Sequence, residues 1–260
     1  MYDIYVPFVE DVEMKVPYEK AKEMVSKALK PLGEEYVQIL RDGFEAGWID
    51  VYENVGKTSG AYSWGCYDAH PYVLMNYQNN LNSVFTLAHE MGHAMHTYYS
   101  NKNQPYPLAS YRIFVAEVAS TLNEILLTYY LLDFIDDRAT RAYIINNYLE
   151  GFKGTVYRQT MFAEFERIVH KKILEGIPLT CDDLCNIYYD LVKKYHGDNI
   201  VIDREIEMEW ARIPHFYRSF YVYKYAIGFS AASFLAKGIL DGEEGAVERY
   251  IEFLSSGGSD

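Results

Sequence analysis

Two histidines and a glutamate within one pentapeptide are the residues of this sequence best suited to chemistry. The segment reads His89-Glu90-Met91-Gly92-His93. Because residues four apart share one face of a helix, His89 and His93 can direct two imidazoles at the same metal ion. Imidazoles combined with a carboxylate favour zinc, which lowers the pKa of a bound water toward about 7. Glu90 can then act on that metal-activated water as a general base without ligating the metal.

A third protein ligand has to come from outside the pentapeptide. His96 lies on a similar face, seven residues after His89. Seven residues span about 10 Å along a helix axis, whereas zinc–nitrogen bonds are about 2 Å long. We therefore expect His96 to support the ligands or to pack beside them, and not to bind the metal.

Glu117 is the better candidate for the third ligand. It lies in an apolar helical stretch, residues 114–120, and acidic side chains are rarely buried unless they are paired or bound to a metal. Two histidines and a glutamate would hold one Zn²⁺ per chain and leave an open position for water, as catalytic sites do. Glu124, seven residues later on the same face, is expected to orient a ligand histidine through its free ring N–H. The alternative for Glu124 is a solvated acid on the helix surface.

Two long helices are needed to position these residues. Periodicity predicts one helix over 83–99, which carries the histidines, and another over about 111–133, which carries Glu117. Further helices are predicted over 18–32, 34–46, 138–152, 157–175, 182–195, 215–239 and 243–255. Between residues 49 and 79 short β-type segments alternate with glycines, which predicts a small antiparallel sheet. The predicted fold class is mainly α with one small sheet.

Residues 72–77 form a strand-like run within this predicted sheet. An exposed edge strand there could pair with an extended peptide through main-chain hydrogen bonds. A plain sheet strand is the alternative. Gly60 and Gly65 would let a second backbone approach closely.

The overall composition limits the class of partner. The chain has 260 residues, half of them apolar, so it can bury a sizeable core. Its 37 acidic and 24 basic residues give a net charge of −13, which argues against nucleic acid or an anionic membrane surface as the main partner. No apolar run approaches the length of about 18 residues that a membrane span needs, and the N-terminus does not resemble a secretory signal. We therefore expect a cytoplasmic protein.

The three cysteines, Cys66, Cys181 and Cys185, are too few and too scattered to form a disulfide framework. Cys181 and Cys185 could share a helix face, but they lack the two further nearby ligands of a structural zinc site. This cysteine usage fits a reducing compartment.

Several blocks of the chain, in the same order, resemble the oligoendopeptidase F family, which belongs with the thimet oligopeptidase-like zinc peptidases. The similar blocks are residues 59–65, 70–77, 84–96, 103–106, 114–121, 213–217 and 220–228. The resemblance implies a zincin-like helical catalytic domain, with zinc ligands at His89, His93 and Glu117 and a base at Glu90.

The resemblance also implies that a tyrosine-rich C-terminal helix faces the zinc. On it, His215 and one or more of Tyr217, Tyr221, Tyr223 and Tyr225 would contact the substrate. A His or Tyr donor aimed at the oxyanion of the tetrahedral intermediate would add to the stabilisation by the metal. Residues 221, 223 and 225 cannot all share one helical face, so we rank Tyr225 first, then Tyr221, then Tyr223. Aromatic packing is the alternative for the whole group.

The predicted function is that of a zinc-dependent endopeptidase that hydrolyses internal bonds of short, unfolded oligopeptides. Expected substrate-binding residues near the sheet are Gly60, Ala61, Tyr62 and Tyr72. Two alternatives stay open. One is a non-catalytic or weakly active peptide-binding fragment that keeps the zinc site. The other is a zinc exopeptidase, which needs a group that captures a free peptide terminus; no motif is dedicated to this, although Arg212, Arg218 and Lys224 lie near the tyrosines.

Compared with the family, residues 1–260 correspond to a single zinc-peptidase catalytic domain. The family's N-terminal helical domain, which forms the opposite wall of a deep cleft, and its extreme C-terminal segment are not in this sequence. Without that wall, apolar surface would stay uncovered, and such surface favours self-association. The sequence itself does not predict an oligomeric state.

Overall fold

The protein is described by a computed structural model that covers residues 6, 9, 12 and 14–258. Contacts divide the chain into two compact units. The smaller unit comprises Met1–Glu10 and Leu149–Ile227, and the larger unit comprises Asp11–Tyr148 and Gly228–Asp260. The single catalytic domain expected from the sequence stays a prediction, and each unit is described by itself.

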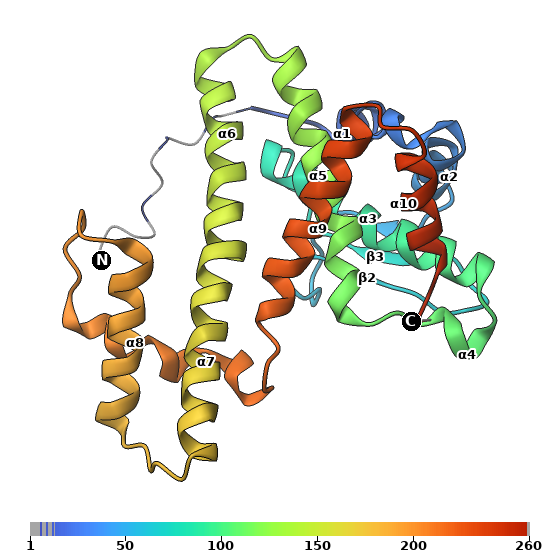
Figure 1. Ribbon diagram of the computed structural model, residues 1–260. Coiled ribbons are helices and arrows are strands. Elements are labelled where there is room, and N and C mark those ends of the chain that lie inside the picture. The colour runs from blue at the N-terminus through green and yellow to red at the C-terminus, as the bar shows by residue number, and fades with distance from the viewer. Residues whose placement is uncertain (1–5, 7–8, 10–11, 13, 259–260) are drawn as a thin grey trace. The chain divides into compact units, whose positions relative to one another are not determined.

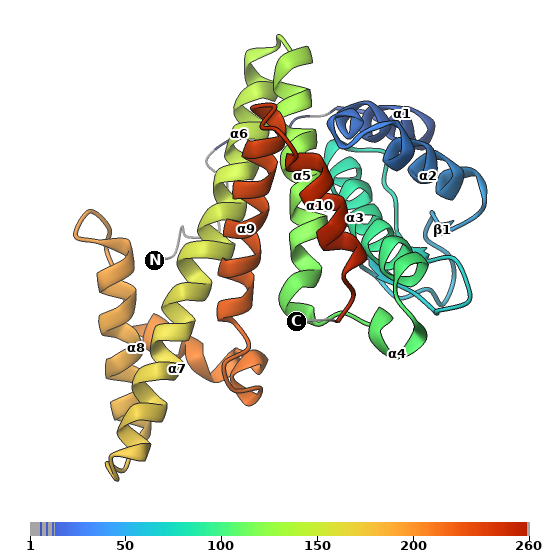
Figure 2. The same cartoon turned by 45° about the vertical axis from the view of Figure 1, so that its right-hand side comes forward.

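In the larger unit, helices pack on one side of a small sheet, which lies against α3 (Figures 1 and 2). Its elements are α1 (Tyr18–Ala28), η2 (Lys30–Leu32), α2 (Glu34–Glu45), β1 (Ile49–Asp50), β2 (Tyr62–Trp64), β3 (Tyr72–Leu74), α3 (Leu81–Asn103), α4 (Tyr106–Ala109), α5 (Ile113–Phe134), most of α6 (Arg138–Phe152), most of α9 (Tyr223–Leu240) and α10 (Ala246–Ser255). The prediction of a mainly α fold with a small sheet is confirmed.

Helix α3 lies at the centre of this unit, between α5, α10 and the sheet. It begins at Asn80, whose side chain accepts a hydrogen bond of 2.8 Å from the N–H of Ser83, an N-cap that satisfies one of the free donors of the first turn. Leu87 and Met91 of α3 are fully buried, as is Leu122 of α5. Burial of each such side chain stabilises the fold by about 1.5–3 kcal/mol.

The crossing of α3 and α5 depends on Gly92. A Cβ atom at this position would lie 2.6 Å from Ser120 Cα and 2.7 Å from the Ala119 carbonyl oxygen. Both are backbone atoms of α5, so no side-chain movement could relieve the overlap. Gly92 therefore allows the two helix backbones to come close together.

The sheet is mixed, so the predicted antiparallel arrangement is only partly correct. In the described residues the strand order is β1-β3-β2, with β2 antiparallel to β3 and β1 parallel to β3. The connection from β1 to β3, residues 51–71, contains β2 and is long enough to bring the chain back in the original direction. The central strand β3 is paired on both sides, so of the two alternatives for residues 72–77 the plain sheet strand is confirmed and the exposed edge strand is wrong. The edge strands among the described residues are β1 and β2.

The smaller unit packs α7 (Arg158–Leu174) against α8 (Cys181–His196). Its core is formed by Met161, Phe162, Phe165, Tyr188, Leu191, Val192, Ile213 and Val222. A π-helix, η3 (Lys153–Tyr157), joins α6 to α7 where the sequence predicts a break. A 3₁₀-helix, η4 (Arg204–Arg212), packs against α8.

The single helix predicted over 215–239 is wrong in its first part. The chain forms a short 3₁₀-helix, η5 (Pro214–Tyr217), then a turn, and α9 begins only at Tyr223. Phe220 has a φ of 57°, and a left-handed residue cannot continue a right-handed helix. Among the described residues, no helix combines the length and apolar character needed to cross a bilayer.

The Gly92 contact predicts a selective loss of stability. In Gly92→Ala the new methyl group meets the α5 backbone, so α3 and α5 must separate, and the free energy of unfolding should fall by about 1–3 kcal/mol. Gly151→Ala is the control, because a Cβ atom there meets nothing within 4 Å. Urea unfolding followed by circular dichroism measures both. Equal stability of Gly92→Ala and the parent would contradict the close crossing.

Candidate metal centre

Three side chains of the larger unit direct one donor atom each at a common point. His89 and His93 lie one turn apart on α3, and Glu117 lies on α5. The two Nε2 atoms are 3.2 Å apart. Glu117 Oε2 lies 3.5 Å from His89 Nε2 and 3.6 Å from His93 Nε2. The structure thus brings together the three residues that the sequence predicts as ligands.

The size of this triangle fits a zinc ion. In tetrahedral coordination with bonds of 2.0–2.1 Å, neighbouring ligand atoms are about 3.3–3.4 Å apart. The three observed separations, 3.2, 3.5 and 3.6 Å, lie around that value. The three side chains are 17–29% exposed, so solvent can reach a fourth position. Two imidazoles and a carboxylate with an open position are the donor set of a catalytic zinc site.

Each of the three candidate ligands has a partner that fixes its orientation. Glu124 Oε1 lies 2.5 Å from His89 Nδ1, so Glu124 contacts the ring N–H of a candidate ligand, as expected from the sequence. The Ser120 hydroxyl donates a hydrogen bond to Glu117 Oε2 at 3.0 Å. The His93 ring forms a hydrogen bond with the Ala116 backbone. Such partners determine ring orientation and ligand basicity in metal sites.

A buried amide that sequence reasoning missed links the helices behind the centre. Asn123 donates from Nδ2 to the Ala88 carbonyl at 3.1 Å and accepts from the Tyr36 hydroxyl at 3.3 Å. It is fully buried on α5. The single amide side chain of this largely apolar helix was the available signal, because a buried polar group needs partners.

The neighbours of the two imidazoles shift their pKa values in opposite directions. Burial opposes a positive charge on His89, but the hydrogen bond to Glu124 and the nearby carboxylates outweigh burial and raise the pKa of His89 to about 9. Burial and the adjacent His89 charge lower the pKa of His93 to about 4. Without a metal, therefore, His89 holds a proton at neutral pH and His93 is neutral.

Glu90 lies beside the ligands as a buried carboxyl group. It is 6% exposed, and its Oε2 has no hydrogen-bond partner within the described part of the chain. Burial raises the pKa of Glu90, the charge of His89 opposes this, and Glu117 and Glu124 add to it, so that the pKa is about 7. A carboxyl group with that pKa can both accept and release a proton near neutral pH.

His96 packs behind the centre, as expected from its distance along the helix. Its ring stacks on Tyr111 with centroids 3.7 Å apart and lies 5.3 Å from the ring of Phe253. Burial lowers the pKa of His96 to about 3, so it is neutral. The Tyr111 hydroxyl contacts the His93 carbonyl at 3.4 Å, which connects this packing to a ligand-bearing turn.

The substrate-binding residues predicted near the sheet lie in or next to its strands. Gly60 and Ala61 precede β2, and the Gly60 carbonyl accepts a hydrogen bond from Asn76 at 2.8 Å. Tyr62 on β2 and Tyr72 on β3 are about half exposed. Tyr72 and Leu74 alternate with Val73 along β3, and Val73 is buried. Tyr62 pairs with Leu74, so both tyrosines stand on the outer face of the sheet.

The predicted aromatic residues belong to the smaller unit, where three of them form one cluster. The ring centroids of His215 and Tyr221 are 5.6 Å apart, those of His215 and Tyr225 are 6.0 Å apart, and those of Tyr221 and Tyr225 are 5.7 Å apart. Tyr217 is 90% exposed, and Tyr223 is the first residue of α9. The structure therefore groups His215 with the two tyrosines that the sequence ranks highest.

The Glu124–His89 contact predicts how zinc affinity depends on pH. Zinc and a proton compete for His89, so the affinity of the parent should rise with pH up to about 9, the pKa of His89. Glu124→Gln removes the charge, so the rise should end at a lower pH. Above pH 9 the poorer ring orientation should reduce affinity about 10- to 100-fold.

Competition with a chromogenic chelator measures these affinities across the pH range. Asp133→Asn is the matched control, because Asp133 is an exposed acid near the end of the same helix. An unchanged pH profile in Glu124→Gln would show that Glu124 does not act on His89.

Comparisons with known proteins agree on one family. A family model described as peptidase family M3 matches residues 1–260. The chain is 59% identical over 259 residues to oligopeptidase PepF of Bacillus subtilis, covering 100% of this chain and 39% of that protein. It is 45% identical over 259 residues to the chromosomal oligoendopeptidase F of Lactococcus lactis subsp. cremoris, covering 100% and 43%.

A solved structure gives the same result. The oligoendopeptidase-F from Enterococcus faecium is 41% identical and superposes with a TM-score of 0.75, over 100% of this chain and 39% of that one. The chain thus spans about two-fifths of the length of these relatives. The match of the family model to the whole sequence, together with these identities, shows that the chain belongs to peptidase family M3.

Proposed function

We propose that this chain is the zinc-binding catalytic part of an endopeptidase that cleaves internal bonds of short, unfolded peptides. One observation carries the proposal: His89, His93 and Glu117 hold their donor atoms at the edge lengths of a zinc tetrahedron. The buried Glu90 carboxyl group lies beside them. A structural zinc site would use four protein ligands and would not need this carboxyl group.

Zn²⁺ bound to these three residues would act as a Lewis acid that makes water nucleophilic near neutral pH. Glu90 is the proposed general base, which accepts the proton of the attacking water. The protonated Glu90 then donates to the nitrogen of the leaving amine. In the metal-free chain burial raises the pKa of Glu90 to about 7, which supports a carboxyl group that can carry a proton as well as accept one.

We infer that an extended peptide binds along the free edge of β2. Strand β3 cannot take a further strand, because β1 and β2 already pair with it. Backbone pairing on β2 beside Gly60, Ala61 and Tyr62 would bind peptides of many sequences. The relatives are named oligopeptidase and oligoendopeptidase, which supports short peptides cut internally. The free thiols Cys66, Cys181 and Cys185 fit a cytoplasmic location.

His215, Tyr221 and Tyr225 are the proposed contacts to the reacting carbonyl group. Their clustering within the smaller unit supports a shared role. Imidazole N–H and phenol O–H groups can donate to a developing oxyanion, which such donors stabilise more than they stabilise the ground state. Tyr217 and Tyr223 are proposed to contact other parts of the peptide.

Glu90→Gln provides the sharpest test of the reaction. The amide has nearly the same shape but cannot accept the proton, so zinc content should stay at one per chain while turnover falls at least about 10²- to 10⁴-fold. Cleavage of a quenched fluorescent peptide library measures turnover, with zinc assayed on the same samples and a chelator-treated parent as reference. Parent-like cleavage by Glu90→Gln would show that Glu90 is not the base.

The cleavage products separate the two alternatives. Internal cuts by the parent that stop with chelator support the endopeptidase. Removal of residues from one terminus only would identify an exopeptidase. Stoichiometric zinc without any turnover would indicate a peptide-binding fragment with an intact metal site.

A further inference from the structure

Phe220 holds a backbone conformation that phenylalanine rarely adopts. Its φ is 57°, in the left-handed region. Among the described residues, Asn79 is the other non-glycine residue with a positive φ, and asparagine tolerates this region far better than a bulky side chain does. Such a conformation costs free energy and persists only where surrounding contacts impose it. The contacts around Phe220 therefore have to supply that energy.

A buried carboxylate supplies the main polar contact. Glu166, in the middle of α7, accepts the N–H of Phe220 through Oε1 at 2.9 Å. Its side chain is buried, and its Oε2 has no hydrogen-bond partner in the described part of the chain. Burial raises the pKa of this carboxyl group. A buried carboxyl group with only one of its two oxygens hydrogen-bonded destabilises the fold. Its hydrogen bond to the turn therefore explains its interior position better than a contribution to stability does.

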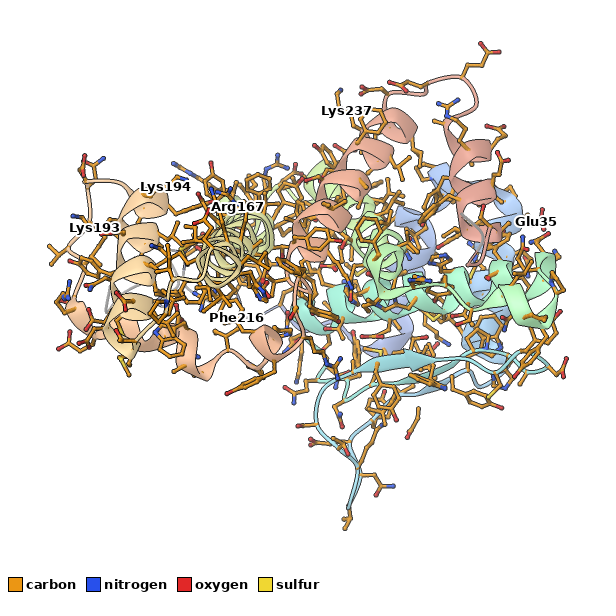
Figure 3. All side chains as sticks on the ribbon, turned by 60° about the horizontal axis from the view of Figure 1, so that its bottom comes forward. Glu35, Arg167, Lys193, Lys194, Phe216 and Lys237 are labelled. Carbon is orange, nitrogen blue, oxygen red and sulfur yellow. The ribbon has the colours of Figure 1, made fainter. Side chains whose placement is uncertain are left out.

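Apolar contacts fix the residues on either side of the same turn. Phe216, labelled in Figure 3, packs against Phe162 and Phe165 of α7 at ring distances of 5.5 and 5.3 Å. Val222, on the far side of the turn, is fully buried. The ring of Phe220 itself lies 4.7 Å from that of His170, one turn after Glu166 on α7. Helix α7 thus contacts the turn before and at Phe220, and Val222 anchors it afterwards in the apolar cluster that contains Phe162 and Phe165.

The turn determines where the aromatic cluster forms. His215 lies before Phe220, whereas Tyr221 and Tyr225 lie after it. If the chain continued as a helix through residue 220, His215 and Tyr221 would be six residues apart and would point to different faces. With the turn, their rings stack at 5.6 Å with an interplanar angle of 27°. The turn that contains the left-handed Phe220 therefore brings the two side chains together.

We propose that Glu166 is a positioning residue, which holds the left-handed turn at Phe220 and thereby places His215, Tyr221 and Tyr225 in one cluster. Its effect on peptide cleavage rests on the proposed function of that cluster. Its effect on ring positions does not, so the two can be tested separately. Glu166 acts through the backbone of Phe220 and needs no contact with the substrate.

Substitutions at two positions test this role. Glu166→Met keeps the side-chain volume and removes the acceptor. The His215 ring resonance, followed by NMR with labelled histidine, should then shift, because the ring currents of Tyr221 and Tyr225 change. In the same variant, kcat for the fluorescent peptides should fall about 10- to 100-fold at unchanged zinc content. Glu166→Gln keeps an acceptor oxygen and should stay close to the parent in both measurements.

Rescue at Phe220 distinguishes positioning from a general structural role. Glycine adopts a positive φ without strain, so Phe220→Gly added to Glu166→Met should restore the His215 resonance and most of the lost kcat. Phe220→Ala removes the same ring but keeps the strain, so it should not restore either. Equal rescue by alanine and glycine, or an unchanged resonance in Glu166→Met, would overturn the proposal.

Two further outcomes have a defined meaning. If Glu166→Met does not fold, the double variant with Phe220→Gly decides alone: recovered folding with the parent resonance supports the proposal, and no recovery overturns it. If the parent itself does not cleave peptides, the proposed function fails, and the resonance still decides whether Glu166 positions the cluster.

Discussion

The close crossing of α3 and α5 is the contact on which the candidate metal centre depends. At Gly92 the two backbones approach to a distance that no Cβ atom would allow. One turn before Ser120, Glu117 then faces His89 and His93 of α3. One turn after it, Asn123 and Glu124 meet Ala88 and His89. One helix contact thus places a candidate ligand and the groups that orient the others.

The same crossing concentrates charge that is unfavourable without a cation. Glu90, Glu117 and Glu124 surround two imidazoles in a partly buried space. Burial and the two other carboxylates raise the pKa of Glu90, and the three carboxylates raise the pKa of His89 by favouring its positive charge. Burial penalises each charge, and the carboxylates repel one another. A divalent cation at the common point of the donor atoms would relieve both effects. The arrangement is thus a local conflict within an otherwise well-packed core, as is common at functional sites.

The three residues of the candidate metal centre could be predicted from the sequence because helical periodicity converts spacing into geometry. His89 and His93 need only one helix, and an acid in an apolar stretch identified Glu117. Sequence reasoning could not find the role of Gly92, which depends on the opposing α5 backbone. It also missed the break at Phe220, because the group that stabilises it, Glu166, lies 54 residues away. The parallel pairing of β1 with β3 likewise depends on the path of the intervening chain. These errors all concern contacts between distant segments.

X-ray absorption at the zinc edge of the purified chain would show whether His89, His93 and Glu117 bind one zinc ion together. We expect one zinc per chain with about four nitrogen and oxygen ligands near 2.0–2.1 Å, and outer-shell scattering from two imidazoles. A sulfur shell near about 2.3 Å, which only thiolate ligands give, would contradict this expectation. So would zinc with a single imidazole, because His89 and His93 would then not share the ion.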